Sequence, residues 1–357
     1  MAKIYVNYGN QIMEDARRLL HESDITHYLK KEMSVAIKPN LVLSRPAEEG
    51  ATTHPQVVEG VILFLKDTGV KNISVMESSW VGDDTKKAYK RCGYEPLRDK
   101  YNIPLIDLKD DGVITKDAEG CGIPVCRKAL ETDFLINVPV LKAHCQTLLT
   151  CCMKNLKGVI PDSEKRRFHT MGIHKPVAAL NKIITAGYNL VDGICGDLTF
   201  EEGGSPIPGH RLICGRNSLA VDSYCAALIG LMPDEIGYLR EGLRMGLGEY
   251  AKEGDIIEFN RDNKPPALPK KINAAVPYID LIKEDGACSA CYASLIHALH
   301  RLRVRKARVC IGQGFKNKKG GTGDLGIGVC CGGFSKFIMG CPPKASDIVS
   351  FLKKHIV

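Results

Sequence analysis

The sequence lacks the features that would place the protein in or across a membrane. No run of about 18 consecutive apolar residues occurs anywhere in it. The opening stretch, MAKIYVNYGN, lacks the charged start and apolar core of a secretory signal peptide. We therefore expect a cytoplasmic protein that has no membrane partner.

Motifs for two common ligand classes are also missing. The glycines at 312–321 do not form a G-x-G-x-x-G turn between a strand and a helix, so we predict no NAD and leave flavin undetermined. The formal net charge of +8 suits an anionic small molecule or an acidic protein, although a solvated basic surface explains it equally well. No recognition motif or aromatic-studded basic stripe favours nucleic acid, so we do not expect such a partner.

Cysteine, by contrast, is abundant, with 15 residues in a chain of 357. Thiols in the cytosol stay reduced and disulfides are rare there. We therefore expect several cysteines to be metal ligands or reactive groups, and the others to be small buried apolar residues.

Short β-rich runs alternate with helical patterns in the first 200 residues. Strands are predicted at Ser34–Lys38, Asn72–Glu77, Phe134–Val138 and Tyr188–Asp192. A helix is predicted over VVEGVILFLKDTG, which places Val58, Val61, Ile62 and Leu65 on one face and Gly69 at its end. This alternation predicts an α/β fold with a doubly wound, mainly parallel sheet.

The composition changes near residue 260. The segment RDNKPPALPKK is polar and rich in proline, as linkers are. We therefore expect a large α/β domain at 1–260, a linker at 261–274 and a smaller, cysteine-rich α/β domain at 275–357.

The last part of the chain is predicted to contain strands at PYIDLI, ARVCIG and FIMG and helices at CYASLIHALHRL and SDIVSFLKKHI, with Ser346 capping the second helix. If the strands are parallel, Cys288, Cys291 and Cys341 lie at one sheet edge. The glycine-rich loop GQGFKNKKGGTGDLGIG then brings Cys330 or Cys331 to them. We favour Cys330, because it directly follows the Gly-Ile-Gly run, and expect Cys310 to be a core residue.

Three sites are compatible with these cysteines. A [4Fe–4S] cluster uses four thiolates, glycine-rich surroundings and often a proline after the last cysteine, all of which occur here. Structural zinc usually takes two close cysteine pairs, and the second pair here is loosely spaced. A redox dithiol needs only Cys288 and Cys291. We rank the cluster first, with Cys288, Cys291, Cys330 and Cys341 as ligands, zinc second and the dithiol third.

Several segments, taken together and in order, resemble the family called domain of unknown function 362. They are TTHPQVVEGVILFLKDTGVKNISVMESS, KPNL, VPVLKAH, KNLKGVIP, VDG and LAVDSYCAALIG, within roughly the first 230 residues. The resemblance implies the fold and an association with C-terminal iron–sulfur modules, commonly of ferredoxin type, but no reaction. The dispersed cysteines of this chain depart from that type. Cys151 and Cys152 stand where hydroxyl or apolar residues are expected.

Polar residues follow several predicted strands and should meet at the carboxyl edge of the large sheet. The segment at 142–175, which we call the basic hub, is the densest of these and holds seven Lys or Arg and three His residues. We predict Lys142, His144 and Lys154 as catalytic residues, with His144 handling protons. Lys38, Asn40 and Asn155 are predicted to bind an anionic substrate. The alternative is that these residues cap helices, close turns or pack, with Cys145, Leu148, Leu149 and Cys152 at helical spacing.

Together these features favour an iron–sulfur-dependent oxidoreductase that passes electrons between the cluster and an anionic small molecule in the large domain. The basic stretch from Arg301 to Gly321 is by default a solvated face, and its alternative roles are to offset the negative charge of the cluster or to dock an acidic electron carrier such as a ferredoxin. The alternatives are a non-enzymatic iron–sulfur carrier or assembly helper, and a structural metal clip on a non-redox enzyme.

Overall fold

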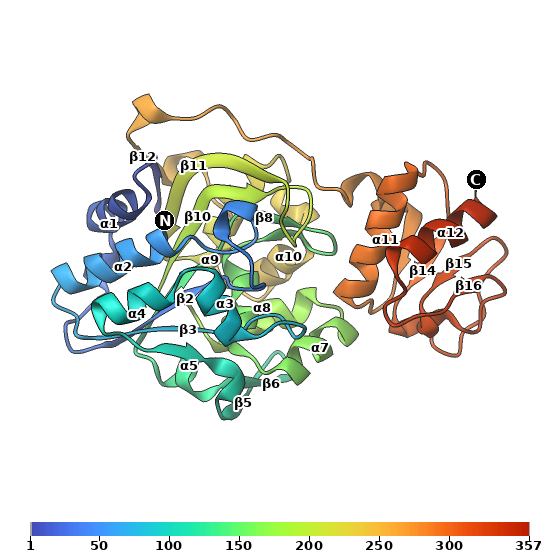
Figure 1. The fold of residues 1–357 in the computed structure, drawn as a ribbon, viewed down its shortest axis with the longest axis horizontal. Helices are drawn as coiled ribbons and strands as arrows, with labels where there is room; N and C mark the ends of the chain where they lie inside the picture. Colours follow the sequence, from blue (N-terminus) through green and yellow to red (C-terminus); the bar gives the residue numbers. More distant parts are fainter. Residues whose placement is uncertain (1, 357) are drawn as a thin grey trace.

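The computed structural model describes residues 2–356 and contains an eight-stranded sheet and a separate four-stranded sheet (Figure 1). The strand order of the large sheet is β12-β1-β11-β10-β7-β2-β3-β4. These strands are β1 (Ile4–Tyr8), β2 (Ser34–Pro39), β3 (Asn72–Glu77), β4 (Leu105–Asp107), β7 (Phe134–Val138), β10 (Tyr188–Asp197), β11 (Pro206–Gly215) and β12 (Ile256–Phe259). All neighbours are parallel except β11, which is antiparallel to both β1 and β10. The prediction of a mainly parallel α/β sheet is confirmed.

Helices cover both faces of the large sheet, as expected of strands that are buried throughout. One face carries α1 (Ile12–Glu22), α2 (Pro55–Asp67), α3 (Thr85–Arg91) and α4 (Glu95–Tyr101). The other carries α5 (Arg127–Glu131), α6 (Cys152–Asn155), α7 (Asp162–Thr170), α8 (His174–Ile183), α9 (Ser218–Leu228) and α10 (Gly237–Arg244). The predicted helix is α2, and Gly69 ends it with a positive φ of 84°.

Two small hairpins lie outside the large sheet. They pair β5 (Val113–Ala118) with β6 (Cys121–Cys126), and β8 (Lys142–His144) with β9 (Leu148–Thr150). The second hairpin corrects the helical interpretation of Cys145, Leu148 and Leu149. These side chains are buried as that interpretation supposed, but the turn at 145–147 reverses the chain and Leu148 has a positive φ of 65°.

The four-stranded sheet near the C-terminus is wholly parallel, in the order β13-β14-β15-β16. Its strands are β13 (Ile282–Glu284), β14 (Val309–Ile311), β15 (Leu325–Ile327) and β16 (Phe337–Ile338), accompanied by α11 (Ser289–Leu302) and α12 (Ala345–His355). This part has its own hydrophobic core, which includes Leu295, Leu299 and Ile348.

Two local predictions in this part are wrong. The strand predicted at PYIDLI is mostly a 3-10 helix, Val276–Leu281, and extended pairing begins only at Ile282. Ser346 does not cap α12, because that helix already begins at Ala345. Short apolar runs of similar length occur both in strands and in 3-10 turns that begin with proline, so the length of the run does not distinguish the two.

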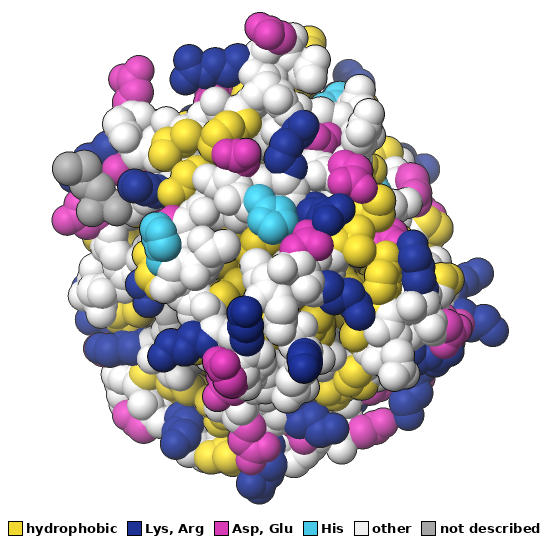
Figure 2. Space-filling model, turned by 90° about the vertical axis from the view of Figure 1, so that its left-hand side faces the viewer, with side chains coloured by type: hydrophobic (Ala, Val, Ile, Leu, Met, Phe, Trp, Pro, Cys, Tyr) yellow, Lys and Arg dark blue, Asp and Glu magenta, His cyan; other side chains and the backbone are white. Residues whose placement is uncertain are grey.

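An extended segment joins the two parts across the top of Figure 1, where the predicted linker lies. Beyond the 3-10 turn at Arg261–Asn263, residues 264–275 form no helix or strand. Within residues 2–356, no helix is both long enough and apolar enough to cross a bilayer. On the face of the large domain in Figure 2, basic and acidic side chains are interspersed, which is typical of a solvated surface.

Candidate functional site

The four predicted cluster ligands lie at the carboxyl edge of the small parallel sheet. Cys288 follows β13 and immediately precedes α11, and Cys291 lies in the first turn of that helix. Cys330 lies in a 3-10 turn after β15, and Cys341 follows β16. Parallel pairing puts the carboxyl ends of all four strands on one side, so the sheet topology brings these segments together.

The electrostatics of the thiols show that they are neighbours. Burial raises the pKa of Cys291 to about 12, and the charges of Cys288, Cys341 and Cys330 add to this effect. The pKa of Cys288 is raised by burial and then by Cys330 and Cys341. Thiols that oppose one another's ionisation in this way need a cation or a cationic cluster core to hold them as thiolates.

The two members of the Cys330–Cys331 doublet have different environments. Cys331 is fully buried, and its thiol donates a hydrogen bond to the carbonyl oxygen of Cys310 at 3.4 Å. Cys330 is partly exposed. Cys310 is itself buried in a small core with Phe315 and Phe334. Cys330 is therefore the more accessible thiol of the doublet.

Glycines let the backbone approach this edge closely. Gly312 has a φ of +125°, and a Cβ there would lie 2.1 Å from the carbonyl oxygen of Asp285. Gly328 has a φ of +84°, and its Cβ position is 3.9 Å from Sγ of Cys291. Larger residues would strain the backbone of both turns.

The basic hub contacts the loop that carries Cys288. The side-chain amide of Gln146 donates to Oε1 of Glu284 at 2.7 Å and to the carbonyl oxygen of Ala287 at 3.0 Å. The hydroxyl of Ser289 donates to Oε1 of Gln146 at 2.8 Å and lies 3.3 Å from Nδ1 of His169. The hub and the thiol edge are thus adjacent, although more than 100 residues separate them along the chain.

Lys142 and His144 occupy strand β8 at the centre of the hub. Nζ of Lys142 donates to the carbonyl oxygens of Ala51 at 2.7 Å and Glu201 at 3.0 Å, and burial lowers its pKa to about 8. Nδ1 of His144 accepts hydrogen bonds from the backbone N–H groups of Gln146 and Thr147. Burial, and then nearby lysines, lower the pKa of His144 well below its usual range. His144 is therefore neutral at pH 7 and carries its hydrogen on Nε2, 3.7 Å from Oε1 of Glu201.

Lys154, Lys157 and His169 form a group of basic side chains beside His144. Nζ of Lys154 reaches only Oγ1 of Thr150, at 3.4 Å, and Nζ of Lys157 lies 3.3 Å from Nε2 of His169. Burial lowers the pKa of Lys157 to about 7 and that of His169 to about 2, and it lowers the pKa of Lys154 well below the usual value. Within residues 2–356, neither lysine has a carboxylate within 4.0 Å.

Lys38 lies deeper, as part of a closed ion pair. Its Nζ is 2.7 Å from Oε2 of Glu77, and its side chain has no exposed surface. Gly158 lies directly against this pair, because a Cβ there would be 1.9 Å from Oε1 of Glu77 and 2.6 Å from Nζ of Lys38. The KNLKG segment thus lies directly over the carboxyl ends of β2 and β3.

Asn40 and Asn155 are already hydrogen-bonded within the fold. Oδ1 of Asn40 accepts the N–H of Val42 at 3.2 Å, which closes the turn after β2. Nδ2 of Asn155 donates to Oδ1 of Asn137 at 2.8 Å, and Nδ2 of Asn137 donates to Oδ1 of Asn189 at 2.9 Å. This chain of amides connects α6 to β7 and β10.

Sequence reasoning missed a group with metal-ligand spacing in the core of the large domain. Sulfur atoms of Cys151 and Cys152 and a carboxylate oxygen of Asp222 all lie within 4.8 Å of one another. Both oxygens of Asp222 also accept backbone N–H groups, from Cys152 at 2.6 Å and Met153 at 3.0 Å. The adjacent residues Cys151 and Cys152 are visible in the sequence as a possible ligand pair. No local pattern in the sequence indicates that Asp222 lies beside them.

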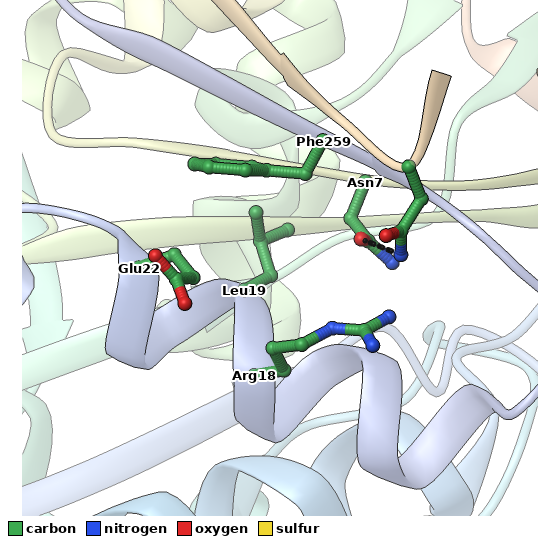
Figure 3. A pocket seen from close by; sticks show the side chains of 6 residues that line it. Asn7, Arg18, Leu19, Glu22 and Phe259 are labelled. Carbon is green, nitrogen blue, oxygen red and sulfur yellow. Dashed lines mark hydrogen bonds between the residues drawn. The ribbon is translucent and has the colours of Figure 1, made fainter. Parts of the chain in front are cut away.

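Two surface hollows lie away from these residues. Figure 3 shows a hollow of about 180 Å³ between α1 and strands β1 and β12, lined by Asn7, Arg18, Leu19, Glu22, Phe259 and Asn260. A second hollow of about 590 Å³ is lined by Ser44, Arg45, Pro46, Glu49 and Arg91. None of the predicted site residues lines either one.

Comparison with known proteins finds one curated relative and several solved structures. A thylakoid-associated protein of Synechocystis sp. is 26% identical over 239 residues, which are 64% of this chain and 72% of that protein. The lactate racemase apoprotein from Thermoanaerobacterium thermosaccharolyticum superposes with a TM-score of 0.45 at 12% identity over 63% of this chain. A protein from Thermotoga maritima superposes with a TM-score of 0.38 at 17% identity over 67% of this chain. This chain spans 57% and 59% of the lengths of those two structures.

The sequence match to a family is more extensive. Residues 35–227 match the family described as domain of unknown function (DUF362). The match begins in β2 and ends in α9, so it includes the strands and the hub that form the carboxyl edge of the large sheet. Because it covers more than half of the chain, the protein belongs to the DUF362 family.

Proposed function

We propose that this protein is an iron–sulfur oxidoreductase that exchanges electrons with an anionic small molecule bound at the basic hub. Cys288, Cys291, Cys330 and Cys341 would hold a [4Fe–4S] cluster, which supplies one-electron transfer when bound. The observation that carries the proposal is the contact between the two sites. Gln146 and Ser289 join the hub to the loop that bears Cys288.

The spread of the thiols favours a cluster over zinc. Ligands of a single zinc ion at about 2.3 Å cannot lie more than about 4.6 Å apart. In the described part of the chain, no three of these four sulfurs lie within 4.8 Å of one another. A cluster binds each thiolate through a different iron and therefore spaces them more widely.

The unpaired lysines of the hub favour an anionic substrate. Burial and the charge of Lys157 lower the pKa of Lys154 and outweigh the opposing charge of Glu201, and no carboxylate in the described part of the chain lies within 4.0 Å of either Nζ. A carboxylate or phosphate would offset the charge of these lysines through charge-assisted hydrogen bonds. Lys142 would add positive charge from beneath while remaining bonded to Ala51 and Glu201.

The other predicted residues take more specific roles in this proposal. His144 is neutral, so it would donate a hydrogen bond from Nε2 and not act as a cation. Lys38, Asn40 and Asn155 would shape the edge beneath the substrate, because their polar atoms are already occupied by Glu77, Val42 and Asn137.

An acidic electron carrier is the partner that this arrangement suits, in the cytoplasm. Arg301 lies in the last turn of α11, about 20 Å along the helix from Cys288, and Arg303 and Lys306 follow the end of that helix. Lys316, Lys318 and Lys319 lie in the loop after β14 and are exposed. Gln313 of the same loop contacts Sγ of Cys288 at 3.7 Å. We therefore assign docking to these three lysines and not to the arginines.

The test is anaerobic purification and reconstitution with iron and sulfide, followed by metal analysis, visible absorption and EPR. We expect about four iron atoms per chain and a signal that is lost in Cys341→Ala but kept in Cys214→Ala, a control at a buried thiol of the large domain. Zinc in place of iron, or equal signals in the two variants, would contradict the proposal.

A further inference from the structure

Three residues outside the hub form a nucleophile–base–carboxylate series. Nδ1 of His54 lies 2.8 Å from Oδ2 of Asp192, and Nε2 of the same ring lies 3.8 Å from Sγ of Cys195. The ring thus bridges a buried carboxylate and a thiol. Sequence separations of 138 and 141 residues hide this arrangement from any local motif.

The fold places the three residues where open α/β sheets hold their ligands. His54 immediately precedes α2, which follows the carboxyl end of β2, and β10 carries Asp192 and Cys195. In a regular strand, residues 192 and 195 would point to opposite faces. The pairing of β10 with β11 shifts register between Gly193 and Cys195, and this irregularity lets the thiol reach the ring that Asp192 holds.

The ring is fixed in position and in protonation state. Oδ2 of Asp192 accepts hydrogen bonds from both the backbone N–H and the ring of His54, while Oδ1 accepts the N–H of Ile194. Burial lowers the pKa of His54, but the Asp192 carboxylate outweighs this effect and raises the pKa to about 10. The ring therefore holds a proton on the nitrogen that faces Cys195.

The thiol can be reached from solvent. Cys195 is partly exposed, whereas His54 is 4% exposed and Asp192 is fully buried. The thiol also hydrogen-bonds to the carbonyl oxygen of Ala47, at 3.5 Å. Cys195 is thus the most exposed of the three residues, as a nucleophile that must contact a substrate has to be.

We propose that Cys195, His54 and Asp192 form a second reactive site that accepts an acyl group from an activated carboxylic acid derivative. Cys195 is the nucleophile, His54 moves the proton, and Asp192 is a positioning residue. The sulfur forms a bond to the acyl carbon, the bond from that carbon to the leaving oxygen breaks, and the leaving oxygen takes the thiol proton through Nε2 of His54. The step involves no change of oxidation state and no metal.

The test uses p-nitrophenyl acetate as the probe on the full-length protein, with p-nitrophenol release followed by absorbance and the acetyl group located by peptide mass spectrometry. We expect Cys195 to be acetylated at least about tenfold faster than any other cysteine. Its rate should change little between pH 6 and pH 8, because His54 holds the proton. An isolated thiol, with a pKa of about 8.5, would react about tenfold faster for each added pH unit.

Variants separate this site from general thiol reactivity. Cys195→Ala should abolish the fast release, and His54→Gln should slow acetylation of Cys195 at least about tenfold. Asp192→Asn should make the rate depend on pH like that of an ordinary thiol. Cys92→Ala is the control, since that thiol hydrogen-bonds to oxygen atoms of Leu43, Arg45 and Thr52.

The unmodified protein suffices to overturn the proposal, whatever the variants do to folding. If Cys195 reacts no faster than Cys92 or the exposed Cys341, or if its rate follows pH like a free thiol, the site is not reactive. This outcome is independent of iron content and leaves the proposed redox function untouched.

Discussion

Lys38 and Glu77 form an ion pair that is closed off from water. Nζ lies 2.7 Å from Oε2, and the two side chains are 0% and 4% exposed. Burial lowers the pKa of Lys38, and Glu77 opposes that effect. The pair joins β2 to β3 beneath the basic hub, so the edge that carries the candidate site depends on it.

Removing one partner of this pair should be costly. We expect Lys38→Met to lower the free energy of unfolding by about 3–5 kcal/mol, because Glu77 would remain buried without its cation. The double variant Lys38→Met/Glu77→Gln should recover most of the loss. Urea denaturation measures both, and a double variant as unstable as the single one would show that the pair is not the source of the effect.

Gly158 should tolerate no side chain. Gly158→Ala would place a Cβ 1.9 Å from Oε1 of Glu77, and we expect a loss of about 1–3 kcal/mol in thermal or urea denaturation. Gly254→Ala is the matched control, since nothing lies within 4 Å of its Cβ position. Equal stability of the two variants would argue against close packing of KNLKG on the ion pair.

The charge on Lys157 should make stability depend on pH. Its folded pKa is about 7 and its ordinary value is 10.5, so between these values the unfolded chain holds a proton that the folded protein has released. The free energy of unfolding therefore rises with pH between these two values. Below pH 7 the lysine is charged in both states, and the cost of burying that charge lowers the stability in full.

Lys157→Met removes this penalty. The variant should be more stable than the wild type by about 1–2 kcal/mol at pH 6, and the difference should shrink toward pH 10. Urea denaturation at several pH values measures this, with Lys30→Met as the control at an exposed lysine. If the difference in free energy of unfolding between the variant and the wild type stays constant with pH, Lys157 does not lose its proton in the folded protein.

Gln146 should hold the cysteine-rich part against the hub. Gln146→Ala removes hydrogen bonds to Glu284, Ala287 and Ser289, so we expect a local loss of about 1–3 kcal/mol. Hydrogen exchange at residues 284–289 should speed up accordingly. Gln56→Ala, on the exposed side of α2, should leave it unchanged.

The cysteine doublet offers a comparison between adjacent thiols. Cys330→Ala should lose bound iron with little change in the stability of the apoprotein, because that side chain is partly exposed. Cys331→Ala should keep its iron and lose about 1 kcal/mol of stability, since its thiol is fully buried and bonded to Cys310. The reverse pattern of iron content would make Cys331 the ligand.

The periodicity of the sequence predicted the strands that are buried on both faces. Phe134–Val138 and Asn72–Glu77 have the bounds that their apolar runs indicated. The runs at β1, β11 and β12 did not indicate that a strand antiparallel to both its neighbours would extend the sheet beyond β10. Strand order depends on which surfaces pack together, and a local pattern of apolar residues carries little of that information.

The sequence by itself determined that thiols would follow strands of a small parallel sheet and that basic residues would gather after the strands of a large one. Both properties depend on residues close together along the chain. Other properties became visible only in the folded protein. Cys331 is buried whereas Cys330 is not, and Lys38 forms an ion pair with Glu77. His54 contacts both Asp192 and Cys195. These outcomes depend on distances between segments more than 30 residues apart or on side-chain packing, and chain order alone fixes neither.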